Sequence, residues 1–570
     1  MRVKQLFFTY LFFFISAMTA KAQNSDFKTT YLSPTRIVWK AGSVTNEKIL
    51  LEQGTGQAEL SSKPLVTLKN TKDGKASILL DFGKELQGGV QIITGIWGGN
   101  KPVKVRIRFG ESVSEAMSDV GGTGGATNDH AIRDSETLLP WLGNAEIGNT
   151  GFRFVRIDVL EADAKLILKE VRAIFKYRDI AYQGSFNCSD TLLNKIWMMG
   201  AYTVQLNMQN YLWDGVKRDR LVWVGDLNPE IATINAVFGS HNVVPKSLDF
   251  AKDITPLPEW MNGISAYSMW WIINQRDWYH HTGDLKYLQE QKTYLLQLLD
   301  LLNKKVDNNN QEILDGQRFL DWPSSEDPKA VHAGLQGMMV MTLSAGADLS
   351  NVLNDPATAA KCLEAVKRLK QHVPDHNQSK QAAALLALSG LMPAKQANDE
   401  VIAVGGTKNF STFFGYYMLQ AKAKAGDYQG SLNVIRDYWG AMIKLGATTF
   451  WEDFNMDWIK DAAPIDELVP AGKIDIHGAY GAYCYIGFRH SLAHGWASGP
   501  TPWLTEHVLG ITVVAPGCKV VKIEPHLGDL TFAEGTFPTP YGLIKVKHTK
   551  LANGKIKTKI SKPRQVKVIS

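Results

Sequence analysis

The sequence predicts a multidomain protein in which strand-rich regions flank a closed ring of helical hairpins. With 570 residues, the chain exceeds what a single hydrophobic core usually supports. Short alternating apolar runs, separated by Gly, Asn and Asp turns, fill both ends of the chain. Apolar residues at helical spacing fill its middle. Several domains of different secondary structure are therefore expected.

The N-terminus has the pattern of a secretory signal. Two cations precede a largely apolar run over residues 6–18, and a small-residue A-x-A pattern ends at Ala22. We predict that residues 1–22 are a signal peptide and that the protein is exported, either to a periplasm or out of the cell. No later apolar run is long enough to span a bilayer, so no membrane span is predicted.

The charge balance argues against a nucleic-acid partner. The formal net charge is +6, and Arg2, Lys4 and Lys21 of the predicted signal account for three of these charges, which leaves +3. So small a balance favours neither nucleic acid nor an anionic surface as the main partner. Nothing in the composition predicts an oligomeric state.

The cysteines predict neither a metal site nor a disulfide scaffold. The four cysteines lie far apart and form no C-x-x-C pair, although one disulfide would be compatible with export. They are Cys188, Cys362, Cys484 and Cys518. The chain also has no calcium-loop motif. No metal or other cofactor is predicted.

Residues 23–180 are predicted to form an N-terminal antiparallel β-sandwich. The expected strands are short apolar or alternating runs bounded by turn residues. They are residues 78–82, 90–94, 103–109, 152–159 and 166–175.

Residues 181–508 are predicted to be mainly helical. The expected helices are residues 192–213, 265–281, 285–302, 335–353, 356–373, 379–391, 413–425 and 431–444. Long polar loops that carry Trp, Asp and Glu join them. Such loops suit a closed ring of hairpins better than a simple bundle, because they would converge on one cavity at an end of the ring.

Residues 509–570 return to strands. The dipeptide Asn553–Gly554 predicts a two-residue hairpin between the last two alternating runs. Lysines recur along these runs, and we interpret them as the solvated face of a small sandwich.

One stretch in the helical region, WDGVKRDRLVWVGDLNPE over residues 213–230, concentrates charge beside large rings. It contains four carboxylates, three cations and two tryptophans. Carboxylates packed close together, with cations and aromatic walls nearby, separate the pKa values of an acid and a base. A salt-bridged loop that caps the next helix is the structural alternative, but the tryptophans and glycines favour a site. The carboxylates are Asp214, Asp219, Asp226 and Glu230.

Three further loops repeat the association of an acid or an imidazole with tryptophan. RFLDWPSSE contains Trp322, TTFWEDFNMDW contains Trp451 and Glu452, and SLAHGWASGPTPW contains His494. Paired carboxylates supply the acid and the base of glycoside cleavage, and tryptophan faces pack on the C–H surfaces of sugars. The loops therefore predict a carbohydrate-cleaving site.

The chain resembles the bacterial α-L-rhamnosidases, family 78 of the glycoside hydrolases, over most of its length. DGVKRDRLVWVGD is similar to the family signature D-C-P-x-R-D-E-R-x-G-W-x-G-D. LDFGKELQGGV, RIRFGESVSE and GFRFVRIDVL resemble its N-terminal sandwich, and SFNCSDTLLNKIW resembles the entry to its helical ring. WYHHTGD, DWPSSE, TTFWEDF and SLAHGWASGPTPWLTEHVLGI resemble later ring motifs, and VAPGCKVVKIEPHLGDL resembles its C-terminal sandwich.

This resemblance implies an (α/α)6 barrel catalytic domain flanked by N-terminal and C-terminal antiparallel β-sandwiches, and an inverting hydrolysis of terminal α-L-rhamnosides. By position, Glu452 corresponds to the general base of the family, and His494 to the histidine of its late ring motif. The remaining residues implied to line the sugar subsite are Asp214, Arg218, Trp223, Asp226, Trp322, and Trp271 or its neighbour Trp270.

The signature departs from the family at the general acid. The family has Asp, Glu and then Arg, with Glu as the acid, whereas here Arg220 follows Asp219 directly and the stretch is one residue shorter. Either Asp219 takes the acid role, or the role has moved to Glu230 or Asp226. Cys-Pro after the first Asp of the signature is also replaced, by Gly215 and Val216.

We therefore predict an exported inverting α-L-rhamnosidase with a carbohydrate substrate. Two alternatives remain open at this point. The same fold could act on another terminal sugar, because the shortened signature lies where the ring is held. A catalytically silent carbohydrate-binding protein could also have kept the aromatic pocket and lost the acid.

Overall fold

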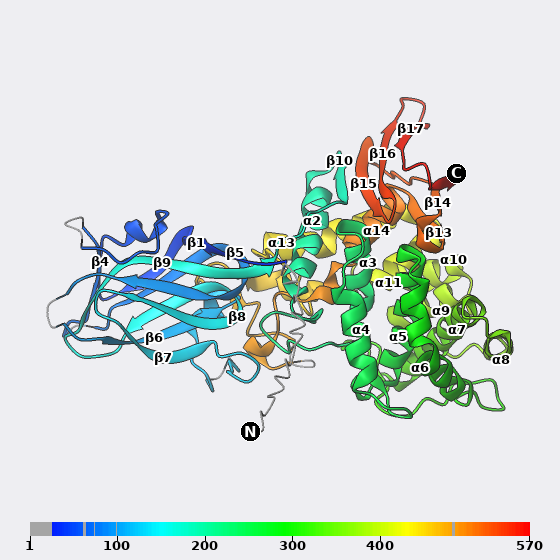
Figure 1. The fold of residues 1–570 in the computed structure, drawn as a ribbon, viewed down its shortest axis with the longest axis horizontal. Coiled ribbons are helices and arrows are strands. Elements are labelled where there is room, and N and C mark those ends of the chain that lie inside the picture. The colour runs from blue at the N-terminus through cyan, green and yellow to red at the C-terminus, as the bar shows by residue number, and fades with distance from the viewer. Residues whose placement is uncertain are drawn as a thin grey trace, which may run out of the picture.

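The computed structural model describes residues 26–60, 64–72, 74–97, 100–122, 124–481 and 485–569. The predicted signal peptide and Cys484 lie outside them. Figure 1 shows the N-terminal strands on the left, the helical region on the right, and the C-terminal strands above the helices.

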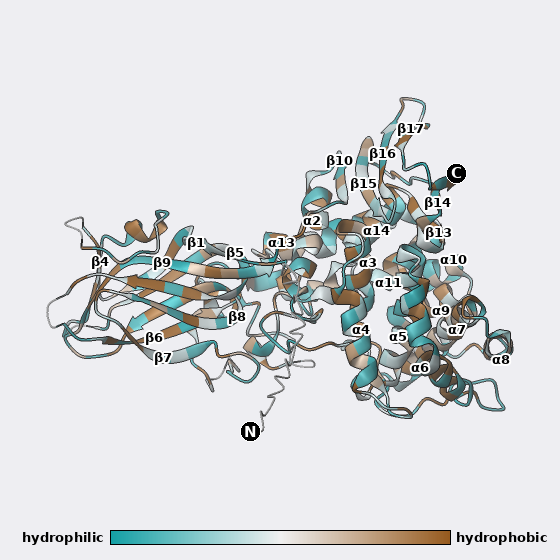
Figure 2. Ribbon diagram, viewed as in Figure 1, coloured by the Kyte–Doolittle hydropathy of each residue, from teal (hydrophilic) through white to brown (hydrophobic). Residues whose placement is uncertain are grey.

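The N-terminal domain is one network of nine strands around an apolar core. The order is β3-β4-β9-β5-β8-β6-β7, with β1 paired to β9, β2 paired to β5, and every pair antiparallel. Figure 2 shows hydrophobic residues along β6 and β8. The strands are β1 Phe27–Leu32, β2 Arg36–Ala41, β3 Ser43–Thr45, β4 Val66–Lys69, β5 Ser77–Thr94, β6 Val103–Gly110, β7 Asp134–Leu139, β8 Asn144–Val159 and β9 Lys165–Arg178.

Two of the predicted strands are parts of one. Residues 78–82 and 90–94 both belong to β5, which is 18 residues long. The register against β8 shifts between Asp81 and Leu86 and again between Gly88 and Val90. Gly88 has a φ of 144°. The intervening Gly-rich segment is therefore a pair of irregularities within one strand, because a bulge accommodates extra residues without ending the ladder.

The helical region alternates between helices buried on all sides and helices with one exposed face. Buried helices form the inner layer of the ring, and amphipathic helices form the outer layer. The outer segments are α2 Thr191–Asn207, α4 Val243–Asp253, α6 Leu285–Asn303, α8 Pro356–Leu369, α10 Ala394–Ala397, α12 Tyr428–Val434 and α13 Gly440–Lys444. The inner helices are α3 Leu227–Val237, α5 Ser265–Thr282, α7 Pro328–Val352, α9 Lys380–Ser389, α11 Gly415–Lys424 and α14 Pro500–Trp503.

Several helix bounds differ from those predicted. The first helix, α2, ends at Asn207, before the charged stretch that follows it. The helix expected from residue 335 begins at Pro328, because the side chain of Asp327 accepts a hydrogen bond from the N–H of Ala330 and Pro328 occupies the first turn. The helices α3 and α4 were not predicted. Nearly every residue of α3 is buried, and it begins within the charged stretch, which was interpreted as a loop. The helix α4 has buried residues at helical spacing, Val244, Leu248 and Ala251, so its pattern was present in the sequence and was overlooked.

The C-terminal region forms two small sheets, one of which takes a strand from before the ring. β10 (Ser185–Cys188) pairs antiparallel with β15 (Phe532–Thr539), which continues to β16 (Gly542–Lys550) and β17 (Ile556–Ser561). The predicted hairpin between β16 and β17 is confirmed, but its connection is longer than the two residues expected: the N–H of Leu551 donates to the carbonyl of Lys555, and Gly554, with a φ of 80°, lies in the loop between them. In the second sheet, β14 (Val520–Ile523) pairs with β13 (Ile511–Ala515) and runs parallel to β18 (Lys567–Ile569).

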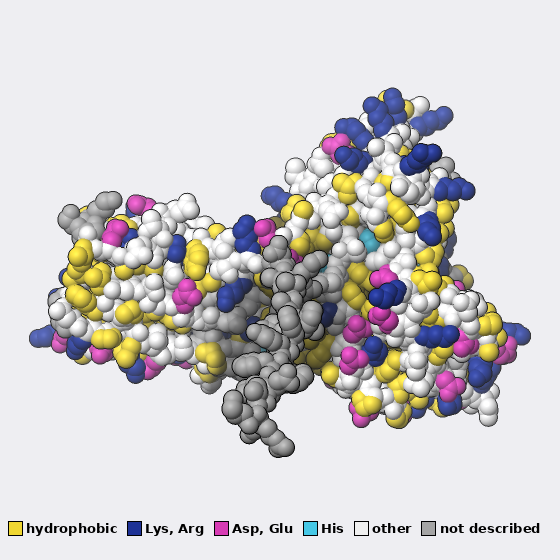
Figure 3. All heavy atoms as spheres, in the orientation of Figure 1, with side chains coloured by type: hydrophobic (Ala, Val, Ile, Leu, Met, Phe, Trp, Pro, Cys, Tyr) yellow, Lys and Arg dark blue, Asp and Glu magenta, His cyan; other side chains and the backbone are white. Residues whose placement is uncertain are grey.

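The lysines of this region are solvated, as the sequence indicates. All six residues of β17 are exposed. Figure 3 shows Lys and Arg side chains gathered at the tip formed by β16 and β17. Cys188, Cys362 and Cys518 are buried and unpaired. Among the described residues, none of the helices combines the length and the apolar character needed to cross a membrane.

Candidate active site

A cavity of about 170 Å³ lies where loops meet the N-terminal ends of inner helices. Seven of the predicted site residues line it, and they come from all four of the loops singled out in the sequence. They are Asp214, Asp219, Trp223, Asp226, Trp322, Glu452 and His494. We call this cavity the sugar pocket.

The charged stretch reaches the pocket as a loop closed on the carboxylate of Asp214. The two oxygens of Asp214 accept hydrogen bonds from the backbone N–H groups of Asp219, at 3.2 Å, and Leu221, at 2.9 Å. Arg220 lies between these two residues with a φ of 64°. A bulky side chain in the left-handed region costs free energy. The shortened signature is therefore a strained turn that Asp214 holds together.

Arg218 joins two carboxylates in this loop. Its Nη2 donates to both oxygens of Glu452, at 2.7 and 2.8 Å, and its Nη1 donates to Oδ1 of Asp219 at 2.8 Å. The guanidinium carbon lies 3.4 Å from the centre of the Tyr485 ring. One buried cation thus holds the two residues predicted as base and acid beside the same pocket.

Glu452 is ionised in this arrangement. Burial alone would raise the pKa of its carboxyl, but the Arg218 guanidinium, together with His494 and His490, outweighs burial and lowers the pKa to about 2. The backbone N–H of Ser491 also donates to Oε2 of Glu452, at 3.0 Å. An ionised carboxylate can accept the proton of an attacking water.

Asp219 lies on the other side of Arg218. Its Oδ2 accepts a hydrogen bond from the indole N–H of Trp223 at 3.1 Å, and Nε2 of His130 lies 3.4 Å from its Oδ1. His130 belongs to the N-terminal domain. It was not predicted as a site residue, because the charged residues near it, such as Asp129 and Arg133, have no tryptophan beside them as in the other loops.

A histidine and a carboxylate pair at the base of the pocket. Nε2 of His494 lies 3.0 Å from Oδ2 of Asp226, and the Tyr267 hydroxyl donates to Oδ1 of Asp226 at 3.0 Å. Burial opposes the charged imidazolium, but the carboxylates of Glu452 and Asp226 raise the pKa of His494 above its ordinary value. The pair presents polar groups that can hold sugar hydroxyls.

Glu230 does not line the pocket. Its carboxyl is fully buried in α3, where Nδ2 of Asn207 lies 3.4 Å from Oε1 and no partner is described for Oε2. Burial raises the pKa of Glu230 well above its ordinary value, and Asp226 and Asp214 raise it further. A Cβ added at Gly495 would lie 1.5 Å from Oε1 of Glu230, so only glycine leaves room at this position.

Three predicted tryptophans lie away from the sugar pocket. Trp270 stacks on Tyr417 at 4.8 Å and lines a separate cavity of about 640 Å³ towards the C-terminal ends of the inner helices. Trp271 donates from Nε1 to the carbonyl of Leu248 at 3.0 Å. Trp451 is buried against Phe454. All three are core residues of the ring.

Several pocket residues were not predicted. Tyr267, Gln317, Phe319, Tyr485 and Trp496 line the sugar pocket. Trp496 donates from Nε1 to the backbone carbonyl of Glu452 at 2.7 Å. It is the tryptophan that accompanies His494 in the loop SLAHGWASGPTPW, so the sequence singled it out without including it among the predicted site residues. The others carry no sequence signal that separates them from core residues.

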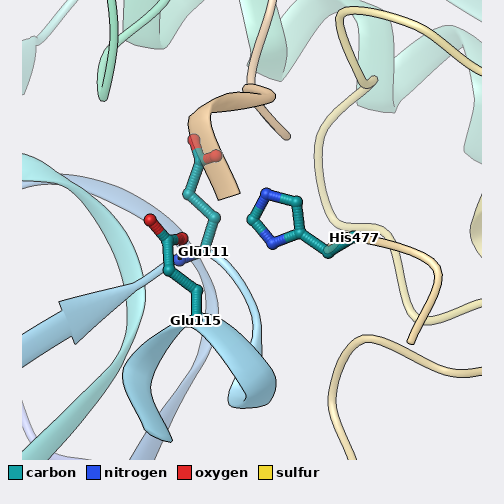
Figure 4. Close-up of side chains that lie close together, drawn as sticks. All are labelled: Glu111, Glu115 and His477. Atoms are coloured by element: carbon teal, nitrogen blue, oxygen red, sulfur yellow. Dashed lines mark hydrogen bonds between the residues drawn. The ribbon is translucent and has the colours of Figure 1, made fainter. Parts of the chain in front are cut away.

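A cluster of potential metal ligands lies beside the pocket, at the junction with the N-terminal domain. Glu111, Glu115 and His477 are buried with ligand atoms within 4.8 Å of one another (Figure 4). Nζ of Lys217 lies 3.0 Å from Oε2 of Glu111 and 3.3 Å from Oε1 of Glu115. The ammonium of Lys217 thus supplies the positive charge at the carboxylates.

Both ring nitrogens of His477 are also engaged. Nδ1 lies 2.7 Å from the Ser112 hydroxyl, and Nε2 lies 2.8 Å from the carbonyl oxygen of His490. Burial lowers the pKa of His477 well below its ordinary value, so the ring is neutral and donates from Nε2. We assign this cluster to joining the domains and not to holding a metal.

Comparison with known proteins agrees with this architecture. Residues 181–508 match the family model described as the bacterial alpha-L-rhamnosidase 6 hairpin glycosidase domain, and residues 510–569 match that of the bacterial alpha-L-rhamnosidase C-terminal domain. An alpha-L-rhamnosidase of Alteromonas sp. (strain LOR) is 24% identical over 546 residues, which cover 86% of this chain and 55% of that protein. The chain thus spans about half the length of the curated relatives it matches.

Solved structures share the fold. The GH78 family rhamnosidase of Bacillus sp. GL1 gives a TM-score of 0.73 at 22% identity, over 90% of this chain and 54% of that one. A rhamnosidase from Klebsiella oxytoca with rhamnose bound gives 0.67 at 18% identity, over 84% of this chain and 95% of that one. The six-hairpin family model covers more than half of the residues of this chain. The chain therefore belongs to the bacterial α-L-rhamnosidase six-hairpin glycosidase family.

Proposed function

We propose that this protein is an exported glycoside hydrolase that removes terminal α-L-rhamnose with inversion of configuration. The observation that carries the proposal is the ionised Glu452 in a pocket with aromatic walls, bound through Arg218 to a second carboxylate. Family membership supports the choice of rhamnose. The N-terminal pattern over residues 1–22 supports export.

Glu452 is the general base of the proposed reaction. Its oxygens face a pocket and are held ionised by Arg218. It removes a proton from the water that attacks the anomeric carbon. In inverting glycosidases, room for this water separates the two carboxyl groups by about 6.5–9.5 Å.

Asp219 is the carboxyl that serves the leaving group. It lines the pocket on the opposite side of the Arg218 guanidinium from Glu452. Asp226 and Glu230 are the other candidates. Glu230 lies outside the pocket lining, and Asp226, which lines the pocket, is paired with His494. Asp219 is preferred to both because Arg218 joins it directly to Glu452.

The walls of the pocket suit a deoxysugar. Trp223, Phe319, Trp322 and Trp496 supply aromatic surface, and Asp214, Asp226 and His494 supply hydrogen-bonding groups. Rhamnose has one methyl-bearing edge and several hydroxyls, so an enclosed cavity of mixed polarity fits it.

The test is to incubate the purified protein with an aryl α-L-rhamnoside and to follow the anomeric proton of the released sugar by NMR. Initial formation of β-L-rhamnose is expected. Release of the α anomer first would contradict inversion.

A panel of other aryl glycosides tests the sugar. Turnover of a different glycoside, with none of the rhamnoside, would favour another terminal sugar, because the shortened signature lies in the pocket. Binding of rhamnose without any turnover would favour a silent carbohydrate-binding protein. A specific observation favours this alternative: both oxygens of Asp219 already accept hydrogen bonds from other side chains.

A further inference from the structure

The N-terminal β domain contributes a loop to the edge of the sugar pocket. This loop, residues 126–133, precedes β7 and carries His130. Nε2 of His130 lies 3.4 Å from Oδ1 of Asp219, 3.6 Å from Oδ2 of Asp129, and 3.5 Å from Nη2 of Arg489. The side chain of His130 is 27% exposed. Its imidazole therefore connects Asp219 with solvent.

In the proposed reaction, a proton must return to Asp219 after each turnover. Its two oxygens accept hydrogen bonds from the Arg218 guanidinium and the Trp223 indole. Neither group has a lone pair with which to accept a proton from a carboxylic acid. An imidazole both gives and accepts protons near neutral pH, and Nε2 of His130 faces Asp219.

A groove of about 400 Å³ adjoins His130 on the N-terminal domain. His130 lines this groove but not the sugar pocket, and Asp219 lines the pocket but not the groove. Their contact therefore marks the boundary between the two. In a glycoside whose terminal sugar fills the pocket, the leaving group must extend across such a boundary.

Arg220 also belongs to the groove. It follows Asp219 directly, donates from Nη1 to the carbonyl of Asn149 at 2.9 Å, and stacks 4.6 Å from the centre of the Trp213 ring. The strained turn of the shortened signature thus points this side chain at the N-terminal domain. Six of the residues that line the groove have polar side chains, which can form hydrogen bonds to a hydroxylated leaving group. Its other lining residues are Asn128, Asp129, Ala131, Ile132, Ser135 and Gly148.

We propose that the loop 126–133 and Arg220 form a leaving-group subsite for a sugar residue, and that His130 returns to Asp219 the proton that Asp219 gives to the glycosidic oxygen. This inference rests on the proposed glycoside hydrolysis. His130 acts through Asp219, so it is a positioning residue and not one that touches the reacting atoms.

Water is the co-reactant, and each proton that is given up in the reaction is accepted by a named group or by solvent. Asp219 protonates the glycosidic oxygen as the bond to the anomeric carbon breaks and its electron pair moves to that oxygen. Water bonds to the anomeric carbon and gives one proton to Glu452. His130, protonated on Nε2, then transfers that proton to Asp219, and the bare Nε2 accepts a hydrogen bond from Nη2 of Arg489 until solvent reprotonates it, while Glu452 releases its proton to solvent.

The test compares His130→Gln with His332→Gln on two α-L-rhamnosides. One substrate has a dinitrophenol leaving group, which departs with little protonation, and the other is a rhamnosyl disaccharide. His332 is a matched control, because it is also 27% exposed and its Nδ1 lies 2.6 Å from a carboxylate oxygen of Glu312. It lies away from the sugar pocket and the groove.

For His130→Gln we expect kcat on the disaccharide to fall by about 10- to 100-fold, part of what a general acid contributes, and kcat on the dinitrophenyl substrate to fall by less than about 3-fold. His332→Gln should match the wild type on both. Equal losses on both substrates, or no loss on the disaccharide, would overturn the relay.

Ser135→Trp tests the subsite. An indole in the groove should exclude the leaving-group sugar and raise KM for the disaccharide about 10-fold, a typical effect of losing one subsite contact. KM for the dinitrophenyl substrate should not change. An unchanged KM for the disaccharide would overturn the subsite.

These outcomes are separable from the identity of the sugar. If the wild type cleaves another glycoside and no rhamnoside, the proposed function fails, and the same pair of leaving groups on that glycoside still decides the role of His130. If the folded protein cleaves no glycoside, both proposals are overturned.

Discussion

Two buried glutamates near the candidate site, Glu452 and Glu230, differ in whether a cation lies beside them. We call Glu452 with its partner the Arg218 side, and Glu230 with its neighbours the Glu230 side. Glu452 and Glu230 are both fully buried. Beside Arg218 the pKa of Glu452 falls to about 2, whereas Glu230, without a cation, has a pKa well above its ordinary value. A buried glutamate therefore becomes a base or a neutral acid according to what lies within hydrogen-bond reach.

Glu452→Gln removes the charge from the Arg218 side and makes it resemble the Glu230 side. We expect kcat to fall by about 10²- to 10⁴-fold, the usual contribution of a general base, while rhamnose still binds. Kinetics and calorimetric titration measure the two quantities. Glu312→Gln is the control, since Glu312 is another fully buried glutamate bound to an arginine, Arg318. Residual activity within about 10-fold of the wild type would contradict the role of Glu452.

Arg218→Met removes the cation and keeps the carboxylate. It leaves Glu452 buried without its guanidinium partner. Breaking one partner of a buried ion pair costs about 3–5 kcal/mol of folding free energy. A large fall in melting temperature is expected, together with a rise in the pKa of Glu452. A variant as stable as the wild type would mean that Glu452 finds another cation.

Gly495→Ala perturbs the Glu230 side alone. The new methyl group would lie 1.5 Å from Oε1 of Glu230, and overpacking of this kind costs about 1–3 kcal/mol. The double variant Gly495→Ala with Glu230→Ala should recover most of the stability, because the carboxyl that clashes is gone. If the two losses simply add, the clash is not the cause.

The two glutamates should also respond oppositely to pH. The folded pKa of Glu452 is about 2 against an ordinary 4.5, so its contribution to stability is full above pH 4.5 and is lost as pH falls towards 2. The folded pKa of Glu230 is raised, so its contribution is full below pH 4.5 and is lost as pH rises through the folded value.

Glu230→Gln should therefore flatten the decline of melting temperature on the alkaline side. The effect of a single group is at most about 1.4 kcal/mol per pH unit. Scanning calorimetry at several pH values measures it, with Glu312→Gln as the control. An unchanged profile would mean that Glu230 is ionised in the folded protein.

The sequence predicts the fold class and the four loops of the site, because both leave local patterns. Helices with one exposed face, such as α6, show the helical period clearly, whereas the almost fully buried α3 begins within the charged stretch without a polar face to mark it. The acids beside tryptophan were found for the same reason. Which tryptophan faces a pocket is decided by the helix that carries it, so Trp270 and Trp271 could not be told from core residues.

Contacts between domains could not be predicted either. His130 lies in a polar loop with no motif, and only the packing of the N-terminal domain against the ring brings it to Asp219. The pairing of β10 with β15 is likewise non-local. Burial and charge at the site depend on such contacts, so the protonation states of its carboxyls required the structure.

The site is held together by contacts between residues very distant in the chain. Arg218 and Glu452 are 234 residues apart, and the N–H of Leu492 donates to Glu111 across 381 residues. Contacts of high sequence separation close late, because the entropy of long loops must be overcome first. We therefore expect the sugar pocket to form late in folding. A chain that stops short of Arg489 carries Arg218, Lys217 and Glu111 without the partners that residues 489, 490 and 492 supply, and has no assembled site.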